Sequence, residues 1–256
     1  MIAAIVAGGI GSRMGGDVPK QFLMLRNRPI LVHTAEQFLQ HPSIEAVIIG
    51  ITPDWYETAE NIRQQYWPHQ PVYLTNGGQN RSETIVNIID FAAKQLSCAD
   101  DTIVLSHDAV RPFVTSQMIQ DSIEAMSRYE ICTAAIPETD TVAYSEDGQC
   151  AAHFPERKYL YRIQTPQTFR LGTFQRVYST LTPQQKAAAT DVCSLFRQQG
   201  YPVALIPGDT RNIKVTFPDD LIVLEGFVLQ TSQQELCPCT PQAFEKPAKN
   251  FSFDDS

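Results

Sequence analysis

Positive charge is scarce in this chain of 256 residues, because 20 Lys and Arg stand against 28 Asp and Glu, a net charge of −8. A nucleic-acid partner demands a basic face, so this balance argues against one. No run of about 18 apolar residues occurs, as a membrane-spanning helix requires. The N-terminus also lacks the basic start and the cleavage pattern of a signal peptide. We therefore expect no membrane partner and a cytoplasmic protein, in which the few cations are informative.

Cysteine offers no recognisable site either. The six cysteines are scattered, none of them forms a C-x-x-C pair, and Cys237-Pro238-Cys239 has no second ligand pair or histidine nearby. Structural zinc sites need such pairs at short spacing. We expect reduced thiols in core or tail positions and no zinc site.

The first 21 residues carry the strongest functional signal. Ile2–Val6 is typical of a short buried strand, and three glycines follow within positions 8–11. Such glycines let the backbone approach a ligand closely and turn its N–H groups toward an anion. Arg13 then supplies a forked donor and Lys20 a point charge. Together they predict a cradle for a triphosphate.

Two well-known phosphate-binding loops do not match this segment. A P-loop needs Gly-Lys followed by Ser or Thr, and no such string occurs. A dinucleotide fingerprint needs a third glycine, but Gly9-Ile10-Gly11 is followed by Arg13-Met14. The remaining alternative is an ordinary glycine turn between a strand and a helix, which the two following cations disfavour.

Strand and helix signals alternate along the chain, which predicts an α/β fold with a doubly wound, mainly parallel sheet. In such sheets, ligands bind outside the carboxyl ends of the strands. Ser82 is expected to cap one helix, and Thr216 with Asp219 to begin the last one. The expected strands are residues 2–6, 46–51, 72–74, 102–105, 132–136, 203–206 and 213–215.

Two segments depart from this alternation. Residues 140–164 alternate polar and apolar side chains around Asp147-Gly148, a hairpin-turn signal. A long hairpin is marginally stable alone, so we expect an arm that packs on a partner, the alternative being an exposed loop. Residues 231–256 are rich in Gln, Ser, Pro and Asp and predict a flexible tail. Residues 1–230 then form a single domain.

Motifs in one fixed order carry a resemblance to a known family. The chain resembles the cytidylyltransferases that act on sugar-alcohol phosphates, a group that contains the methylerythritol 4-phosphate and ribitol 5-phosphate enzymes. The resemblance extends from Met1 to about Leu229. The strings that carry it are Val6-Ala7-Gly8-Gly9-Ile10-Gly11-Ser12-Arg13-Met14, Pro19-Lys20-Gln21, Gly77-Gly78-Gln79-Asn80-Arg81-Ser82, His107-Asp108-Ala109-Val110-Arg111-Pro112, Thr165-Pro166-Gln167, Thr190-Asp191 and Asn212-Ile213-Lys214-Val215-Thr216.

The resemblance implies a Rossmann-like nucleotidyltransferase that uses CTP and a polyol phosphate, and a homodimer formed through the arm at 140–164. The positions that match the family's catalytic residues are Arg13, Lys20, Arg157 and Lys214. Those that match its nucleotide-binding segments are Ala7, Gly8, Gly9, Ile10, Gly78, Gln79, Asn80, Arg81 and Thr84. The expected acceptor-binding residues are Asp108, Arg111, Thr139, Thr165 and Thr190.

The chemistry itself suggests a metal and no strong base. Mg²⁺ draws charge from a triphosphate, and Asp108, at the end of a predicted strand, is the best candidate anchor, although phosphates and water can hold most of the ion. An ionised acceptor phosphate already carries a nucleophilic oxygen. We therefore expect His107 to serve packing or hydrogen bonding.

The acceptor is predicted from one replaced residue. Thr139, in Glu138-Thr139-Asp140-Thr141, stands where the methylerythritol-phosphate enzymes carry an arginine, and Pro155-Glu156-Arg157 fits the ribitol branch. Threonine lacks the always-charged fork that binds phosphate, so Arg157 is expected to supply one. The prediction is CMP transfer to D-ribitol 5-phosphate. The alternatives are methylerythritol 4-phosphate as acceptor, another nucleotide, and a nucleotide-binding module without turnover.

Overall fold

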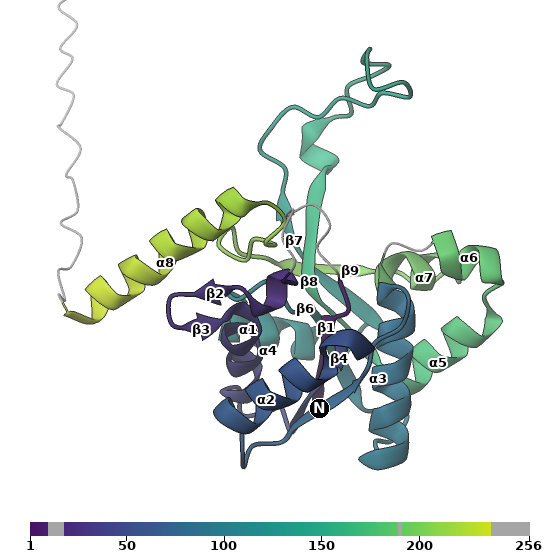
Figure 1. Cartoon of the computed structure of the whole chain (residues 1–256). Coiled ribbons are helices and arrows are strands. Elements are labelled where there is room, and N and C mark those ends of the chain that lie inside the picture. The colour runs from purple at the N-terminus through teal and green to yellow at the C-terminus, as the bar shows by residue number, and fades with distance from the viewer. Residues whose placement is uncertain (10–17, 189–190, 237–256) are drawn as a thin grey trace, which may run out of the picture.

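The computed structural model describes residues 1–9, 18–188 and 191–236, and it builds them around one seven-stranded sheet (Figure 1). The strands lie in the order β5-β4-β1-β6-β8-β7-β9. Their bounds are β1 Ile2–Ala7, β4 Ala46–Ile51, β5 Val72–Asn76, β6 Ile103–Asp108, β7 Ile131–Pro137, β8 Tyr161–Arg170 and β9 Ala204–Pro207. A separate small hairpin pairs β2 (Met24–Leu25) with β3 (Arg28–Pro29).

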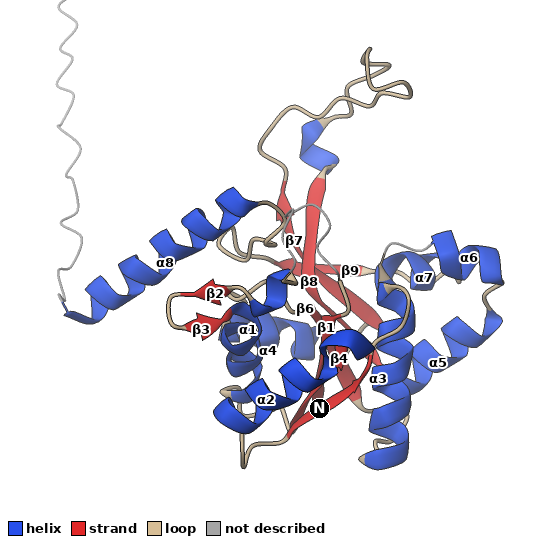
Figure 2. Cartoon of the chain, viewed as in Figure 1, coloured by secondary structure: helices blue, strands red, loops and turns tan. Residues whose placement is uncertain are grey.

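Helices cover both faces of the sheet, as predicted for a doubly wound α/β fold (Figure 2). Side chains of α1, α2 and α4 share one apolar cluster with the sheet, and those of α3, α5 and α7 share another. The helices are α1 Ile30–Leu39, α2 Tyr56–Tyr66, α3 Arg81–Gln95, α4 Ser116–Ala125, α5 Leu171–Thr180, α6 Pro183–Ala188, α7 Val192–Gln198 and α8 Pro218–Leu236. Within the described residues, no helix is long and apolar enough to cross a bilayer.

One strand runs against the rest. β8 is antiparallel to both β6 and β7, whereas β1 pairs parallel with β4 and β6. The sequence did not reveal this strand, because its first residues were assigned to the arm. The expected strand at 213–215 is also wrong. That segment is extended but joins no ladder, and its backbone is held by the Val215 N–H, which donates to the Val110 carbonyl at 3.0 Å.

The helix starts differ slightly from the predicted ones. Asn80, not Ser82, caps α3, because its Oδ1 accepts the Glu83 N–H at 2.9 Å and Ser82 is buried in the first turn. At the start of α8, Asp220 caps instead of Asp219, since its Oδ2 accepts the Thr216 N–H at 2.6 Å. α8 continues to Leu236, beyond the predicted end of the domain at 230.

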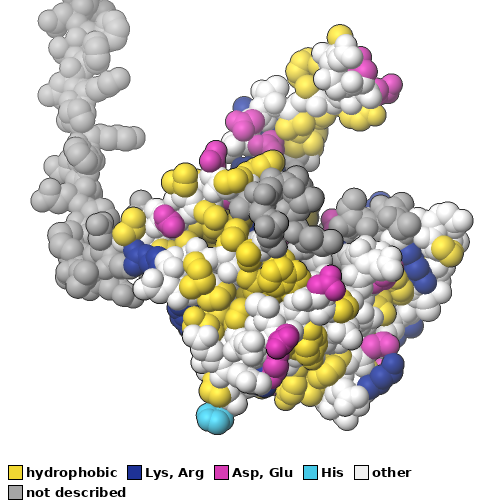
Figure 3. Space-filling model, in the orientation of Figure 1, with side chains coloured by type: hydrophobic (Ala, Val, Ile, Leu, Met, Phe, Trp, Pro, Cys, Tyr) yellow, Lys and Arg dark blue, Asp and Glu magenta, His cyan; other side chains and the backbone are white. Residues whose placement is uncertain are grey.

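The arm projects from the end of the β7–β8 pair (Figures 1 and 3). Only its base is a regular hairpin. Beyond Pro137 the chain forms one isolated bridge, between Tyr144 and His153, and one short 3₁₀ turn, Arg157–Tyr159. The arm carries exposed apolar side chains, among them Phe154 at 65% and Tyr159 at 70% exposure. The expected packing of this surface on a partner stays a prediction.

Candidate active site

A cavity of about 460 Å³ lies at the carboxyl ends of β1 and β6. The chain leaves β1 toward β4 on one side and reaches β6 on the other, so this is the switch point where doubly wound sheets bind ligands. Its volume is that of a small-molecule site. The cavity is lined by Val6, Ala7, Gly8, Gly9, Lys20, Gln21, Thr52, Gly78, Gln79, Asn80, Arg81, Thr84, Asp108, Ala109, Val110 and Lys214.

Small residues give the cavity one narrow wall. A Cβ added to Gly78 would lie 2.2 Å from the Glu83 Cβ, so only glycine fits beside the first turn of α3. Thr84 fixes this loop, because its hydroxyl donates to the Asn80 carbonyl at 2.9 Å and accepts the Gly78 N–H at 3.0 Å. A Cβ on Gly8 would lie 3.1 Å from the same hydroxyl. The Thr84 hydroxyl therefore shapes the loop, and its role in nucleotide binding stays a prediction.

The Pro19-Lys20-Gln21 string reaches the cavity from the opposite side. Lys20 is only 8% exposed, and its Nζ donates to the carbonyls of Val215 at 3.4 Å and Thr216 at 3.3 Å. Gln21, which the sequence did not single out, donates from Nε2 to the Ala7 carbonyl at 2.7 Å. It thereby fixes the end of β1. In the sequence, Gln21 is marked only by its position next to Lys20. Its structural role follows from the contact with Ala7, which only the folded chain shows.

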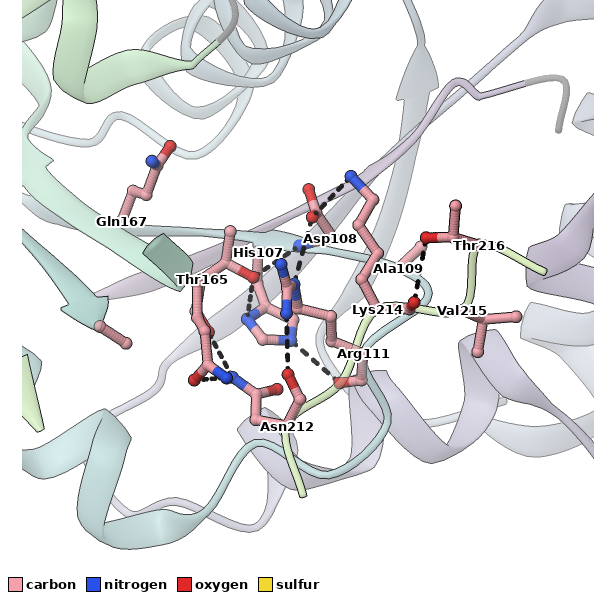
Figure 4. Close-up of polar contacts among 12 residues, drawn as sticks. His107, Asp108, Ala109, Arg111, Thr165, Gln167, Asn212, Lys214, Val215 and Thr216 are labelled. Carbon is pink, nitrogen blue, oxygen red and sulfur yellow. Dashed lines mark hydrogen bonds and ion pairs between the residues drawn. The ribbon is translucent and has the colours of Figure 1, made fainter. Parts of the chain in front are cut away.

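Asp108 stands at the centre of a cluster of three cations. Its Oδ1 accepts Arg81 Nε at 3.2 Å. Its Oδ2 accepts Arg111 Nε at 3.3 Å and pairs with Lys214 Nζ at 3.1 Å (Figure 4). Burial by itself raises the pKa of this carboxyl. The charges of Arg81, Lys214 and Arg111 outweigh burial and hold the Asp108 pKa well below its usual range. One carboxylate thus gathers three of the chain's few cations.

A buried hydrogen-bond chain supports Asp108 from behind. The Asp108 N–H donates to the Thr165 hydroxyl at 3.2 Å, which lies 2.9 Å from His107 Nδ1. His107 Nε2 lies 3.0 Å from the Arg111 carbonyl, and burial lowers the His107 pKa to about 4. Arg111 Nη1 in turn donates to the Asn212 carbonyl at 2.8 Å. His107 is therefore a neutral structural link, consistent with the hydrogen-bonding role expected of it.

The structure brings most of the predicted site residues together. Eleven of them line the cavity: Ala7, Gly8, Gly9, Lys20, Gly78, Gln79, Asn80, Arg81, Thr84, Asp108 and Lys214. Arg111 and Thr165 contact Asp108 from behind the wall. Thr139 and Arg157 do not line the cavity of their own chain. Arg157 lies on the arm, and its Nη1 donates at 2.9 Å to the carbonyl of Thr139, the residue that directly precedes the arm. Ile10, Arg13 and Thr190 lie outside the described residues.

The expected magnesium anchor does not fit this geometry. Mg²⁺ prefers several oxygen ligands, whereas Asp108 is the one carboxylate among the described residues that line the cavity, and three cations surround it. In the part of the chain that the structure describes, no group of three or more His, Cys, Asp or Glu side chains is placed to hold a metal ion.

The motifs and the cavity together match a known family of transferases. The sequence model of the family described as IspD, 2-C-methyl-D-erythritol 4-phosphate cytidylyltransferase, matches residues 1–230. The chain belongs to this family. It is therefore a cytidylyltransferase with a Rossmann-like α/β fold, as the resemblance of its motifs implied.

Individual relatives agree in fold and differ in acceptor. The chain is 39% identical over 229 residues to ribitol-5-phosphate cytidylyltransferases of Streptococcus pneumoniae strains, covering 88% of this chain and 97% of theirs. A crystal structure of a 4-diphosphocytidyl-2C-methyl-D-erythritol synthase is similar with a TM-score of 0.73 and 29% identity, covering 89% of this chain and 98% of that one. The Francisella tularensis 2-C-methyl-D-erythritol 4-phosphate cytidylyltransferase gives a TM-score of 0.71 at 25% identity, with 87% and 98% coverage.

Proposed function

We propose that this chain transfers CMP from CTP to D-ribitol 5-phosphate, with CDP-ribitol and pyrophosphate as products. The observation that carries the proposal is the convergence of Lys20, Arg81 and Lys214 on one cavity beside a glycine-lined wall. These cations come from three distant segments of a chain with net charge −8, and they meet where two anionic substrates must be joined.

In the reaction, an oxygen of the acceptor phosphate attacks the α-phosphorus of CTP in line with the bond to the β-phosphate. The new P–O bond forms as the old one breaks, and the electron pair leaves with pyrophosphate. The protein supplies alignment and neutralisation, and no proton transfer is needed. Lys20, beside the β1 loop, serves the triphosphate. Lys214, held by Asp108 at 3.1 Å, serves the acceptor phosphate.

Asp108 keeps these cations in place. Its low pKa keeps it ionised at neutral pH, so it opposes the mutual repulsion of Arg81, Arg111 and Lys214. When bound, magnesium draws charge from the triphosphate. Since Asp108 already pairs with three cations, the described residues of the cavity offer the ion no free carboxylate.

The acceptor assignment depends on Thr139 and Arg157. Threonine at 139 cannot bind a phosphate as an arginine fork does, and Arg157 is an exposed guanidinium next to it on the arm. Because Thr139 and Arg157 do not line the cavity of their own chain, we propose a homodimer in which the arm at 140–164 brings Arg157 to the partner's cavity. The identity to relatives named for ribitol 5-phosphate supports the same acceptor.

A second acceptor has an observation in its favour, because the matching family is described by 2-C-methyl-D-erythritol 4-phosphate. Initial rates of pyrophosphate release, measured with CTP, Mg²⁺ and each polyol phosphate in turn, separate the two. We expect kcat/KM to favour ribitol 5-phosphate at least tenfold. A preference for methylerythritol 4-phosphate rejects the assignment.

The same assay tests the other two alternatives. With ribitol 5-phosphate fixed, each of the four nucleoside triphosphates is supplied separately, and CTP is expected to give the highest rate. Binding of CTP without pyrophosphate release from either acceptor identifies a nucleotide-binding module. Turnover with another triphosphate in preference to CTP overturns the choice of nucleotide.

A further inference from the structure

A buried glutamine on the antiparallel strand lies beside the cavity without any part in the proposed transfer. Gln167 of β8 is 2% exposed, and its backbone lies opposite Ser106 of β6 and Thr133 of β7. It lies on the same strand as Thr165, whose hydroxyl accepts the Asp108 N–H (Figure 4). A polar side chain buried this deeply is retained through its hydrogen bonds, so its partners indicate its role.

Those partners belong to two separate elements. Gln167 Oε1 accepts Arg81 Nη1 at 3.0 Å and the backbone N–H of Val192 at 3.3 Å. Arg81 begins α3, and Val192 begins α7, where Asp191 caps the helix by accepting the Ser194 N–H at 2.8 Å. One amide oxygen thus joins the first turns of two helices on the same face of the sheet, α3 over β1, β4 and β5 and α7 over β7.

For Arg81, the glutamine completes a set of three acceptors. Nε donates to Asp108 at 3.2 Å, Nη2 to the Ser106 hydroxyl at 3.3 Å, and Nη1 to Gln167. A planar guanidinium held at all three nitrogens has one orientation. Without the glutamine oxygen, the guanidinium keeps its charge and two of its three acceptors, so its orientation in the cavity wall is held less firmly.

We propose that Gln167 is a positioning residue for the transfer reaction, holding the Arg81 guanidinium against Asp108 while its oxygen also fixes the start of α7. The inference rests on the proposed function, because it assigns Arg81 and Asp108 to the walls of the substrate cavity. It adds a residue that touches no substrate and acts through one that lines the site.

A double-mutant cycle tests this action through Arg81. The variants are Gln167→Met, Arg81→Met and the double variant, with kcat/KM for the acceptor measured at saturating CTP from radiolabelled CTP. Gln167→Met alone is expected to lower kcat/KM about tenfold to a hundredfold, the size of a lost hydrogen bond to a charged group. In the Arg81→Met background it is expected to cost less than about threefold, the remainder coming from Val192. If Gln167→Met lowers kcat/KM by the same factor with and without Arg81, the proposal is overturned.

Gln164 provides a matched control on the same strand. It is also buried, at 5% exposure, but its Nε2 donates to the Asp209 carbonyl at 2.9 Å and it does not contact Arg81. Gln164→Met is expected to lose the same factor with or without Arg81. If Gln164→Met shows the same non-additivity, general loosening of the fold explains both, and the specific role of Gln167 is rejected.

A conservative variant separates hydrogen bonding from packing. Gln167→Glu keeps an acceptor oxygen for Arg81 and Val192, so we expect kcat/KM within about fivefold of the unsubstituted protein. A loss as large as that of Gln167→Met contradicts the positioning role. Thermal melting of each variant establishes that it is folded under assay conditions.

Failure of this proposal is distinguishable from failure of the proposed function. The cycle is repeated on the Kd for CTP, measured by calorimetry without any acceptor, and on whichever polyol phosphate the unsubstituted protein turns over. If ribitol 5-phosphate is not a substrate but the CTP cycle is non-additive, the acceptor assignment fails and the role of Gln167 stands. If the protein turns over ribitol 5-phosphate but both mutant cycles are additive, the proposed function stands and only the role of Gln167 is rejected.

Discussion

The cavity and the arm are built in opposite ways, although both contain residues predicted to act on the substrates. Around the cavity, Asp108 is 7% and Lys20 is 8% exposed, and each is held by partners from distant segments. On the arm, Arg157 and Phe154 are exposed, and the contact of Arg157 is with neighbouring backbone of the same arm. Under the proposed function, the chain itself supplies the nucleotide side of the site, whereas the acceptor side needs the arm of a second copy.

The largest expected effect on activity comes from a substitution in the cavity. Lys20→Met removes the charge that we assign to the triphosphate, and we expect kcat/KM to fall a hundredfold to a thousandfold, about 3 to 4 kcal/mol of transition-state stabilisation. Pyrophosphate release is the measurement. Lys94→Met on the exposed side of α3, where the lysine is 70% exposed, is the matched control and should leave the rate unchanged. Equal losses in both variants refute the assignment of Lys20.

Removing the central carboxylate charge comes next. Asp108→Asn is expected to lower kcat/KM about thirtyfold, because three cations lose their shared partner. It should also lower stability by about 2 kcal/mol, less than for a fully buried pair, since Lys214 is 45% exposed.

The sign of the pH effect on this variant follows from the depressed pKa of Asp108. Its stabilising contribution is present above the unfolded-state pKa of about 4 and is lost as the pH falls below that value. The difference in Tm between the original chain and Asp108→Asn should therefore shrink on acidification below about pH 4. A difference that is constant with pH contradicts the ionised cluster.

A smaller effect on activity is expected from a substitution on the arm, and it tests whether the arm acts on the acceptor alone. Arg157→Ala is expected to raise KM for the acceptor phosphate about tenfold and to leave KM for CTP unchanged, because the residue does not line the cavity of its own chain. Lys158→Ala is the control, since Lys158 is the adjacent exposed cation and pairs with Glu156 on the arm. A change in KM for CTP, or an equal effect of Lys158→Ala, removes Arg157 from the acceptor site.

The smallest expected effect on activity concerns His107, whose contribution is to stability. Its pKa lies near 4 because of burial, so it is neutral in the folded chain and gains a proton more readily when unfolded. Stability is therefore lost as the pH falls from about 6.5 to 4, by up to about 3 kcal/mol in all. The His107→Gln variant should show a flatter dependence of Tm over this range. A general base would give kcat a pH-dependent step that disappears when the base is replaced. We expect no such step to be lost from the pH profile of kcat in His107→Gln.

Most of the fold, and most of the residues that line the cavity, could be predicted from local sequence. The apolar run before Gly8 and the placement of Asp108 after a strand are local signals, and both lie at the expected edge of the sheet. What the sequence missed depends on partners far along the chain. Gln21 acquires its role only through Ala7, and Gln167 only through Arg81 and Val192.

The strand errors have the same cause. Residues 213–215 have strand composition, but their neighbour is the Val110 loop and not a strand edge. β8 begins with polar and exposed residues at Tyr161 and Arg162, so its start was assigned to the arm, and its antiparallel direction is set by its pairing with β6 and β7. Pairing between distant strands is a tertiary property, which local composition does not specify.

Phosphorus NMR of the unsubstituted protein with CTP, Mg²⁺ and D-ribitol 5-phosphate tests the central claim most directly. If the gathered cations join the two substrates, the acceptor's phosphomonoester signal is replaced by two coupled diphosphate signals, and one equivalent of pyrophosphate accumulates. Persistence of the monoester signal, with CTP unchanged or simply hydrolysed, would contradict the account.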